Sequence, residues 1–177
     1  MLIFQDFISK EEENTLLMEL EPYLKRMRYE FDHWDNAIHG YRETEKTNWN
    51  EENKNIIRRI KKLAFPEDTT TLQHIHVLDI TKDGYIKPHI DSVRFCGNII
   101  TGISLLSTSV MRLIHEKNPE FKVDVLLPQR SLYIMKNLVR FEYTHQVLAD
   151  KDSFHRGNHI PRERRISIMC RNEPSIS

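Results

Sequence analysis

The chain has 177 residues, of which 39% are hydrophobic and 29% charged, and 26 Lys and Arg balance 26 Asp and Glu to a formal net charge of +0. This length and composition indicate one globular domain with a buried core and exclude a disordered chain. The balanced charge argues against a protein that holds nucleic acid through a general excess of Lys and Arg, although a local basic patch stays compatible with it. No apolar run approaches the roughly 18 residues that span a bilayer, so we expect no membrane partner.

The cysteines and the N-terminus narrow the cellular setting. Cys96 and Cys170 lack the spacing of a metal motif, and we expect two reduced, buried thiols. The N-terminal residues contain no secretory signal and are too acidic for a mitochondrial presequence. They fit a cytosolic protein or a chain whose targeting segment has been removed.

Two helices are predicted in the first 66 residues. Ser9 and Glu12 have the spacing of a capping box, and apolar residues recur at helical spacing over about 10–26. A second helix is predicted over about 50–65, ended by Pro66. One face of this second helix is basic, and we interpret it as a solvated surface rather than an RNA-binding one.

Short runs rich in β-branched and aromatic residues follow Pro66, separated by turn signals. The predicted strands are Leu72–Ile80, Gly84–Ile90, Ile99–Leu106, Val110–His115, Phe121–Leu127, Ser131–Met135, Leu138–Tyr143 and Arg165–Arg171. Residues 148–164 are predicted to form a polar loop. Eight strands without intervening helices predict a mainly β fold, a sandwich or jelly roll, with the two helices packed on one outer face.

The stretch GYIKPHIDS, residues 84–92, places His89 and Asp91 two residues apart on a predicted strand. Such residues lie on one face, with Cα atoms roughly 7 Å apart, so both side chains can reach one ion. His145 is predicted at the end of a late strand, and early and late strands lie side by side in a jelly roll. Two His and one carboxylate on one side of an ion form the facial triad of non-haem Fe(II) oxygenases. The same ligands suit a zinc hydrolase, and the spacing alone also fits polar residues on a solvated face.

The last predicted strand has two arginines on one face. Its other face consists of Ile166, Ile168 and Cys170, which we expect in the core against the helices. Arg165 and Arg171 would then point into the barrel, roughly 20 Å apart along the strand, and a buried guanidinium needs an anion. Together with a metal triad, they favour a clamp for a short dicarboxylate over ion pairs with internal acids. Tyr133 on a neighbouring strand could donate its hydroxyl to that dicarboxylate or be an ordinary core tyrosine.

The order His89, Asp91, then SLYIM, then His145, then R-x-S-x-x-x-R resembles the AlkB-like Fe(II)/2-oxoglutarate dioxygenases. The similarity runs through almost the whole chain and is closest to a mitochondrial member of that family. The segments that carry it are YEFDHWDNAIHGYRETEK, HVLDITKDGYIKPHIDSVRFCG, SLLSTSVMRLIHE and IPRERRISIMCR.

The resemblance implies a double-stranded β-helix and a set of site residues. It implies one AlkB-like domain over residues 1–177, in which a helical support of residues 1–66 packs on a jelly-roll core of residues 67–177. The implied Fe(II) ligands are His89, Asp91 and His145. The implied 2-oxoglutarate-binding residues are Tyr133, Arg165 and Arg171. Ser167 stands where the wider family usually has Asn, which weakens the analogy with base demethylases.

The resemblance also implies an activity and a setting. The activity is hydroxylation of a C–H bond, with O2 as oxidant and 2-oxoglutarate converted to succinate. The implied location is the mitochondrial matrix, with links to programmed necrosis and fatty-acid metabolism, and we expect a monomer.

The substrate stays open at this point. Enzymes that act on bases extrude them, but few residues precede the His89 strand and the resembling member lacks a nucleotide-recognition lid. In the charged segment 28–49, Trp34 and Tyr41 could stack on a base, although we favour their burial against the sheet. A protein or small-molecule substrate is therefore favoured over mitochondrial tRNA. The alternative function is a weakly catalytic regulatory module that binds metal and 2-oxoglutarate and acts through partner proteins.

Overall fold

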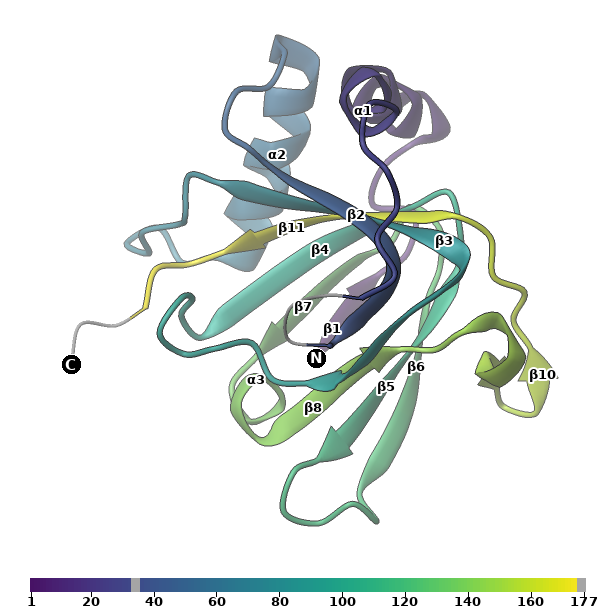
Figure 1. Ribbon diagram of the computed structural model, residues 1–177. Coiled ribbons are helices and arrows are strands. Elements are labelled where there is room, and N and C mark those ends of the chain that lie inside the picture. Colours follow the sequence, from purple (N-terminus) through teal and green to yellow (C-terminus); the bar gives the residue numbers. More distant parts are fainter. Residues whose placement is uncertain (33–35, 175–177) are drawn as a thin grey trace.

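The computed structural model describes residues 1–32 and 36–174. The first half of the chain contains β1 (Leu2–Phe4), α1 (Lys10–Leu24), β2 (Ile38–Lys46), α2 (Glu51–Ala64) and β3 (Ile75–His89). There follow β4 (Ile99–Leu105), β5 (Ser109–His115), β6 (Lys122–Leu127), β7 (Leu132–Lys136), α3 (Leu138–Glu142), β8 (Tyr143–Val147), a 3-10 turn (Asp150–Asp152), β9 (Phe154–His155), β10 (Asn158–His159) and β11 (Arg165–Arg171). Figure 1 shows a curled sheet with α1 and α2 on one side of it.

The first helix begins as predicted. The Ser9 hydroxyl accepts a hydrogen bond from the Glu12 amide at 3.1 Å, and the Glu12 carboxylate accepts one from the Ser9 amide at 2.9 Å. The two bonds satisfy amide donors that a helix start otherwise leaves unpaired. The capping box is therefore confirmed.

We expect Ser9→Ala to lower the free energy of unfolding by about 1 kcal/mol, because the Glu12 amide loses its acceptor. Urea denaturation of the wild type and the variant measures this difference. Thr15→Ser serves as a control, because it keeps the hydroxyl that donates to the Glu12 carbonyl. An unchanged midpoint for Ser9→Ala would show that the cap adds nothing to stability.

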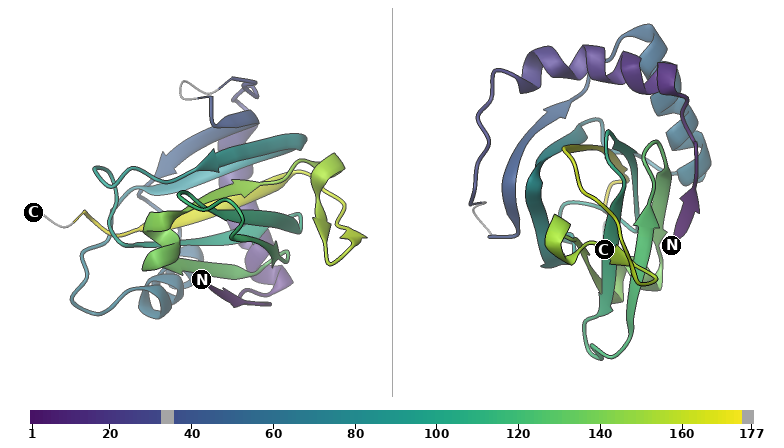
Figure 2. Two further views of the ribbon diagram at one scale, coloured as in Figure 1. Left: turned by 90° about the horizontal axis from the view of Figure 1, so that it is seen from below. Right: turned by 90° about the vertical axis from the view of Figure 1, so that its right-hand side faces the viewer.

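Both helices pack on one outer face of the sheet, as predicted (Figure 2). Leu16, Leu20 and Ile60 share one buried apolar cluster with Ile103 of β4 and Ile168 of β11. A buried amide ties the helices together, since Asn53 of α2 donates to the Thr15 carbonyl and to the Glu19 carboxylate of α1. Among the described residues, no helix is long and apolar enough to cross a membrane.

The sheet is nearly closed because the long strand β3 pairs with both of its halves. The strand order is β1-β7-β4-β11-β3-β8-β5-β6, with β2 pairing on β3. The first part of β3 pairs with β11 through residues 76–80, and its end pairs with β8 at Ile86 and His89. The chain is thus mostly β and has a jelly-roll arrangement with an antiparallel, nearly closed sheet, as the sequence predicted.

Three strands differ from the sequence predictions. The predicted strands 72–80 and 84–90 are one strand, β3, which continues through residues 81–84 and pairs with β2 on both sides of a register shift. The strands β1 and β2 were not predicted from the sequence. In β2, a polar strand, Tyr41 is 4% exposed and its hydroxyl donates to Glu30 at 3.0 Å. Tyr41 is therefore buried, as we favoured, whereas Trp34 lies outside the described residues.

The prediction of a strand over Leu138–Tyr143 is wrong. Asn137 has a φ of +57°, a left-handed conformation that turns the chain after β7, and residues 138–142 form the short helix α3. The strand follows later as β8, which pairs with β5 and β3. The predicted loop over 148–164 also contains the short strands β9 and β10, which pair with each other.

The last strand has the two faces that its sequence indicates. Ile166, Ile168 and Cys170 lie in the cluster beneath the helices. Neither cysteine forms a disulfide and both are buried, as predicted. Burial raises the pKa of Cys170 to about 11, so its thiol stays protonated at neutral pH.

Candidate metal centre

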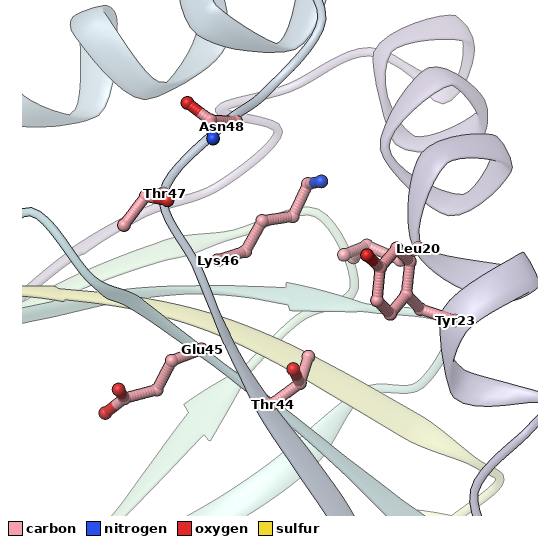
Figure 3. Close-up of a pocket in the computed structure, with 7 residues that line it drawn as sticks. All are labelled: Leu20, Tyr23, Thr44, Glu45, Lys46, Thr47 and Asn48. Atoms are coloured by element: carbon pink, nitrogen blue, oxygen red, sulfur yellow. The ribbon is translucent and has the colours of Figure 1, made fainter.

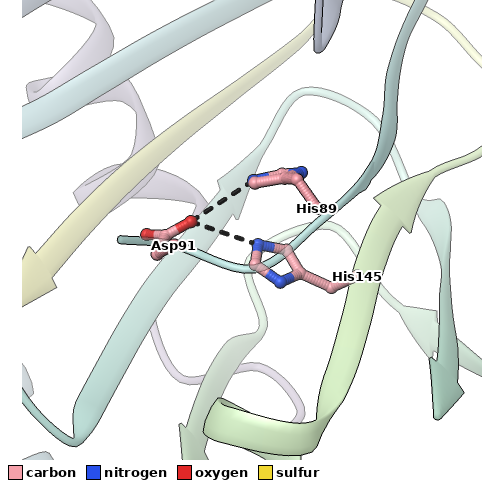
Figure 4. Close-up of side chains that lie close together, drawn as sticks. All are labelled: His89, Asp91 and His145. Carbon is pink, nitrogen blue, oxygen red and sulfur yellow. Dashed lines mark ion pairs between the residues drawn. The ribbon is translucent and has the colours of Figure 1, made fainter. Parts of the chain in front are cut away.

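Two adjacent strands and a loop bring His89, Asp91 and His145 together. His89 is the last residue of β3, and it lies opposite His145 in the antiparallel pairing of β3 with β8. Asp91 follows in the loop that leaves β3. Figure 4 shows the three side chains converging from these segments.

The geometry of the three side chains suits a shared ion. The Nε2 atom of His89 lies 3.3 Å from Asp91 Oδ1, and that of His145 lies 3.6 Å from the same oxygen. The ring centroids of the two histidines are 4.2 Å apart. One ligand atom from each residue lies within 4.8 Å of the others, and this is the one such group among the described residues. The arrangement leaves one side of an ion open, which is the property of a facial triad.

The protonation of the histidines also fits a metal. His89 directs Nδ1 at the Lys87 carbonyl at 2.9 Å, and a proton held there leaves Nε2 to face Asp91. Burial, helped by the nearby His89, lowers the pKa of His145 to about 3. His145 is therefore neutral at physiological pH, and a neutral imidazole is the form that binds metal.

Asp91 is held as a carboxylate by several neighbours. Burial alone would raise its pKa, but the hydrogen bond from His89 and the charge of Arg171 outweigh burial and lower it. Arg171 Nε donates to Asp91 Oδ2 at 2.9 Å. The predicted cosubstrate residue Arg171 thus stands directly beside the predicted metal site.

Arg165 lies deeper in the barrel, and no residue that the structure describes provides a counter-ion for its guanidinium. It is 2% exposed, donates from Nη2 to Ser104 Oγ at 2.8 Å, and has no partner for Nε among the described residues. Arg162 is also fully buried, and its Nε and Nη2 atoms have no hydrogen-bond partner among the described residues. Burial lowers the pKa of Arg165 to about 10, so it still carries its charge at neutral pH. A buried cation without a counter-ion is costly, and an anion bound there would remove the cost.

Tyr133 is a buried residue whose hydroxyl is influenced by the charges of both predicted cosubstrate arginines. It is 3% exposed on β7, and burial raises the pKa of its hydroxyl, while the charges of Arg171 and Arg165 act in the opposite direction. Its ring packs on Gly102 of β4, where an added Cβ would lie 2.7 Å from the ring. The glycine therefore makes the space that the ring occupies. Gly102 and Ser104 were not predicted from the sequence, because neither residue belongs to a motif with a recognisable spacing.

A cavity of about 670 Å³ reaches two residues of the triad, His89 and Asp91. Arg171 also lines it, and β2, the start of β3 and the loop after Asp91 form its walls. The walls include the exposed Phe95 and the pair formed by His76 and Glu43 at 2.7 Å. The volume is typical of a small-molecule or side-chain pocket.

A smaller hollow of about 160 Å³ lies between α1 and the end of β2 (Figure 3). The Lys46 side chain reaches across it, with Nζ 3.3 Å from Glu19 and 5.7 Å from the centre of the Tyr23 ring. These contacts join the edge strand to the helix. The hollow therefore has a structural explanation and contains none of the predicted site residues.

Comparison with known proteins agrees with this geometry. Residues 1–171 match the 2OG-Fe(II) oxygenase superfamily. The chain is 50% identical over 173 residues to the mouse protein "Alpha-ketoglutarate-dependent dioxygenase alkB homolog 7, mitochondrial", covering 98% of this chain and 78% of that protein. It is 52% identical over 168 residues to the cow protein of the same name, covering 95% and 76%. The solved structure of OsALKBH1 superposes with a TM-score of 0.66 at 11% identity, covering 96% of each chain, which supports the double-stranded β-helix fold.

Proposed function

The chain belongs to the 2OG-Fe(II) oxygenase superfamily, and from this premise we propose that His89, Asp91 and His145 hold its Fe(II). Membership makes the chain an enzyme that depends on Fe(II) and uses 2-oxoglutarate and O2. We further propose that 2-oxoglutarate is held by Tyr133, Arg165 and Arg171. The observation that carries the proposal is the convergence of the three side chains, two of which, His89 and Asp91, line a cavity.

The donor set supports Fe(II) in this position. One imidazole from each of two strands and one carboxylate from a loop form the ligand set typical of non-haem Fe(II) oxygenases. Zinc would accept the same three ligands, but a zinc hydrolase needs no buried cations for a dicarboxylate. Arg165, with its unpaired Nε, supplies such a cation in this barrel.

The charges support a dicarboxylate with a defined orientation. Arg171 is already bonded to Asp91, so the carboxylate next to it would lie close to the metal. Arg165 and Ser104 would receive the distant carboxylate, because Arg165 lies at the other end of β11 and is bonded to Ser104 of β4. Guanidinium groups bind carboxylates through two parallel hydrogen bonds, which fixes the orientation as well as adding affinity.

The overall reaction balances without a further reductant. Substrate C–H, O2 and 2-oxoglutarate give substrate C–OH, succinate and CO2, and the bound iron supplies the activation of O2. The residues of the chain would bind and orient the dicarboxylate. Tyr133 is placed to donate its hydroxyl to the dicarboxylate.

The proposal is tested by incubating the purified chain with Fe(II), ascorbate and 2-oxoglutarate and measuring succinate, with and without candidate substrates. Succinate that requires Fe(II) is the expected result. Stabilisation of the fold by metal and 2-oxoglutarate without succinate under any condition would favour the regulatory module instead. Activity that follows Zn(II) and not Fe(II) would indicate a hydrolase.

Replacing Arg165 by Met is expected to weaken 2-oxoglutarate binding by roughly 10- to 100-fold, since a charged hydrogen bond contributes about 1.5–3 kcal/mol. Met nearly preserves the volume and removes the charge. Isothermal titration with 2-oxoglutarate in the presence of Mn(II) measures the change. An unchanged dissociation constant in a folded variant would remove Arg165 from the site, and Arg112→Met on β5 is the matched control.

The setting and substrate are also part of the proposal. We propose that residues 1–177 act as a single domain and a monomer in the mitochondrial matrix, because the relatives at about 50% identity are named mitochondrial. The cavity favours a protein side chain or small metabolite as substrate over mitochondrial tRNA. The links to programmed necrosis and fatty-acid metabolism stay predictions that loss of the gene in cells would test.

A further inference from the structure

A buried arginine in α3 contacts the loop that carries Asp91. Arg140 is 1% exposed, and its guanidinium donates to backbone carbonyls at three places in that loop. Nε bonds to Gly97 at 2.9 Å, Nη1 to Asp91 at 2.8 Å, and Nη2 to Cys96 at 3.3 Å. Nη2 also lies 3.3 Å from the Cys96 sulfur. All of these acceptors belong to the connection between β3 and β4.

The chemistry of these contacts differs from that of the neighbouring arginines. Arg171 pairs with a carboxylate, whereas Arg140 forms no ion pair with any residue that the structure describes. Its charge is balanced by carbonyl dipoles, and guanidinium N–H groups in a rigid fork suit several acceptors at fixed positions. Such a side chain holds the backbone in one shape, because every acceptor must keep its place.

The position of Arg140 joins the two segments that carry the metal ligands. α3 runs directly into β8, so Arg140 precedes His145 by five residues. Its Nη1 contact reaches the backbone of Asp91 itself, while Arg171 holds the Asp91 side chain. The same loop supplies Ser92, Phe95 and Cys96 to the cavity wall.

Other contacts hold the far end of this loop without Arg140. The Gly97 amide donates to the Asn172 carbonyl at 2.8 Å, and the Cys96 amide contacts the Ser92 carbonyl at 3.3 Å. Gly97 is packed so closely that an added Cβ would lie 2.4 Å from the Glu173 carbonyl oxygen. Loss of the Arg140 side chain would therefore release mainly the end that carries Asp91.

We propose that Arg140 is a positioning residue that fixes the backbone of Asp91 relative to His145 and so sets the geometry of the metal site. The inference rests on the proposed assignment of the metal ligands. It predicts weaker metal binding when Arg140 is changed, although Arg140 does not touch the metal. Partners of metal ligands typically contribute 10- to 100-fold to metal affinity.

The test measures the dissociation constant of Mn(II), a redox-silent probe, by calorimetry on wild type, Arg140→Gln and Arg140→Lys. We expect a constant roughly 10- to 100-fold higher for Arg140→Gln and an intermediate value for Arg140→Lys, which keeps the charge but not the fork. Melting temperatures with and without Mn(II) give a second readout. The rise caused by Mn(II) should shrink in both variants.

Arg112→Gln is the matched control. Arg112 on β5 also forms a fork, donating Nε and Nη2 to Asp124 at 2.7 and 2.8 Å on the far strand pair. This variant should keep the Mn(II) constant and the full Mn(II)-induced rise in melting temperature. If wild type binds no Mn(II), the proposed metal site fails. If wild type binds and folded Arg140→Lys or Arg140→Gln binds equally well, the inference about Arg140 is wrong.

Discussion

Asp91→Ala and His89→Ala are each expected to abolish Fe(II)-dependent formation of succinate from 2-oxoglutarate. Each removes one of the three proposed ligands, whose ligand atoms lie within 4.8 Å of one another, and the two that remain would hold iron poorly. Loss of a ligand should cost more than the roughly 10- to 100-fold attributed to outer partners of metal sites. Asp91→Ala has the further effect of leaving the Arg171 guanidinium without its carboxylate.

The measurement is succinate release by purified protein at saturating Fe(II) and 2-oxoglutarate. Circular dichroism of each variant confirms that the fold is retained. His74→Ala is the control, because the His74 side chain is 64% exposed and lies outside the triad. Turnover at the wild-type rate in folded Asp91→Ala protein would exclude the assigned metal site.

Asp79→Asn is expected to lower the free energy of unfolding by about 3–5 kcal/mol, because it breaks buried ion pairs. Asp79 is fully buried on β3. Its two oxygens accept from Arg42 at 2.7 Å, from Arg164 at 2.7 and 3.0 Å, and from the Tyr29 hydroxyl. An amide cannot balance the two cations, and its NH2 group would face their N–H groups.

Urea denaturation of the two proteins measures the loss. Asp124→Asn provides the comparison, since the Asp124 side chain is 27% exposed and its pair with Arg112 should contribute only about 0–1 kcal/mol. Asp79 is not among the predicted metal ligands, so Mn(II) affinity of the folded variant should be retained. Equal losses for the two variants would show that the buried pairs around Asp79 add no special stability.

Elements that are stabilised by residues close together in the sequence could be predicted from it. The capping box at Ser9 depends on hydrogen bonds between residues three apart, so the sequence alone contains it. β11 alternates apolar and polar residues because one face meets the helices and the other meets the barrel interior. The β2 strand shows no such alternation, since its polar residues form an edge that pairs with β3 and, apart from a single bridge at Glu30, with no other described segment.

The failure at residues 138–143 has a different cause. The segment LVRFEY alternates apolar and polar residues well enough for a strand, but the left-handed conformation at Asn137 turns the chain first. The resulting helix brings Arg140 to the Asp91 loop. Arg140 therefore escaped prediction for the same reason that the helix did, because its partners are backbone carbonyls more than forty residues away.

The sequence by itself determined the residue types of the candidate metal site, the jelly-roll class and the burial of the last strand's apolar face, because each depends on periodicity or on the chemistry of side chains close together in the chain. Only the tertiary structure decided that His145 lies opposite His89, that Arg165 finds no counter-ion among residues 1–32 and 36–174, and that Arg140 contacts the Asp91 loop. These features depend on strand register and on contacts between distant segments. Many registers satisfy the same local pattern, and the packing of the whole sheet selects one of them.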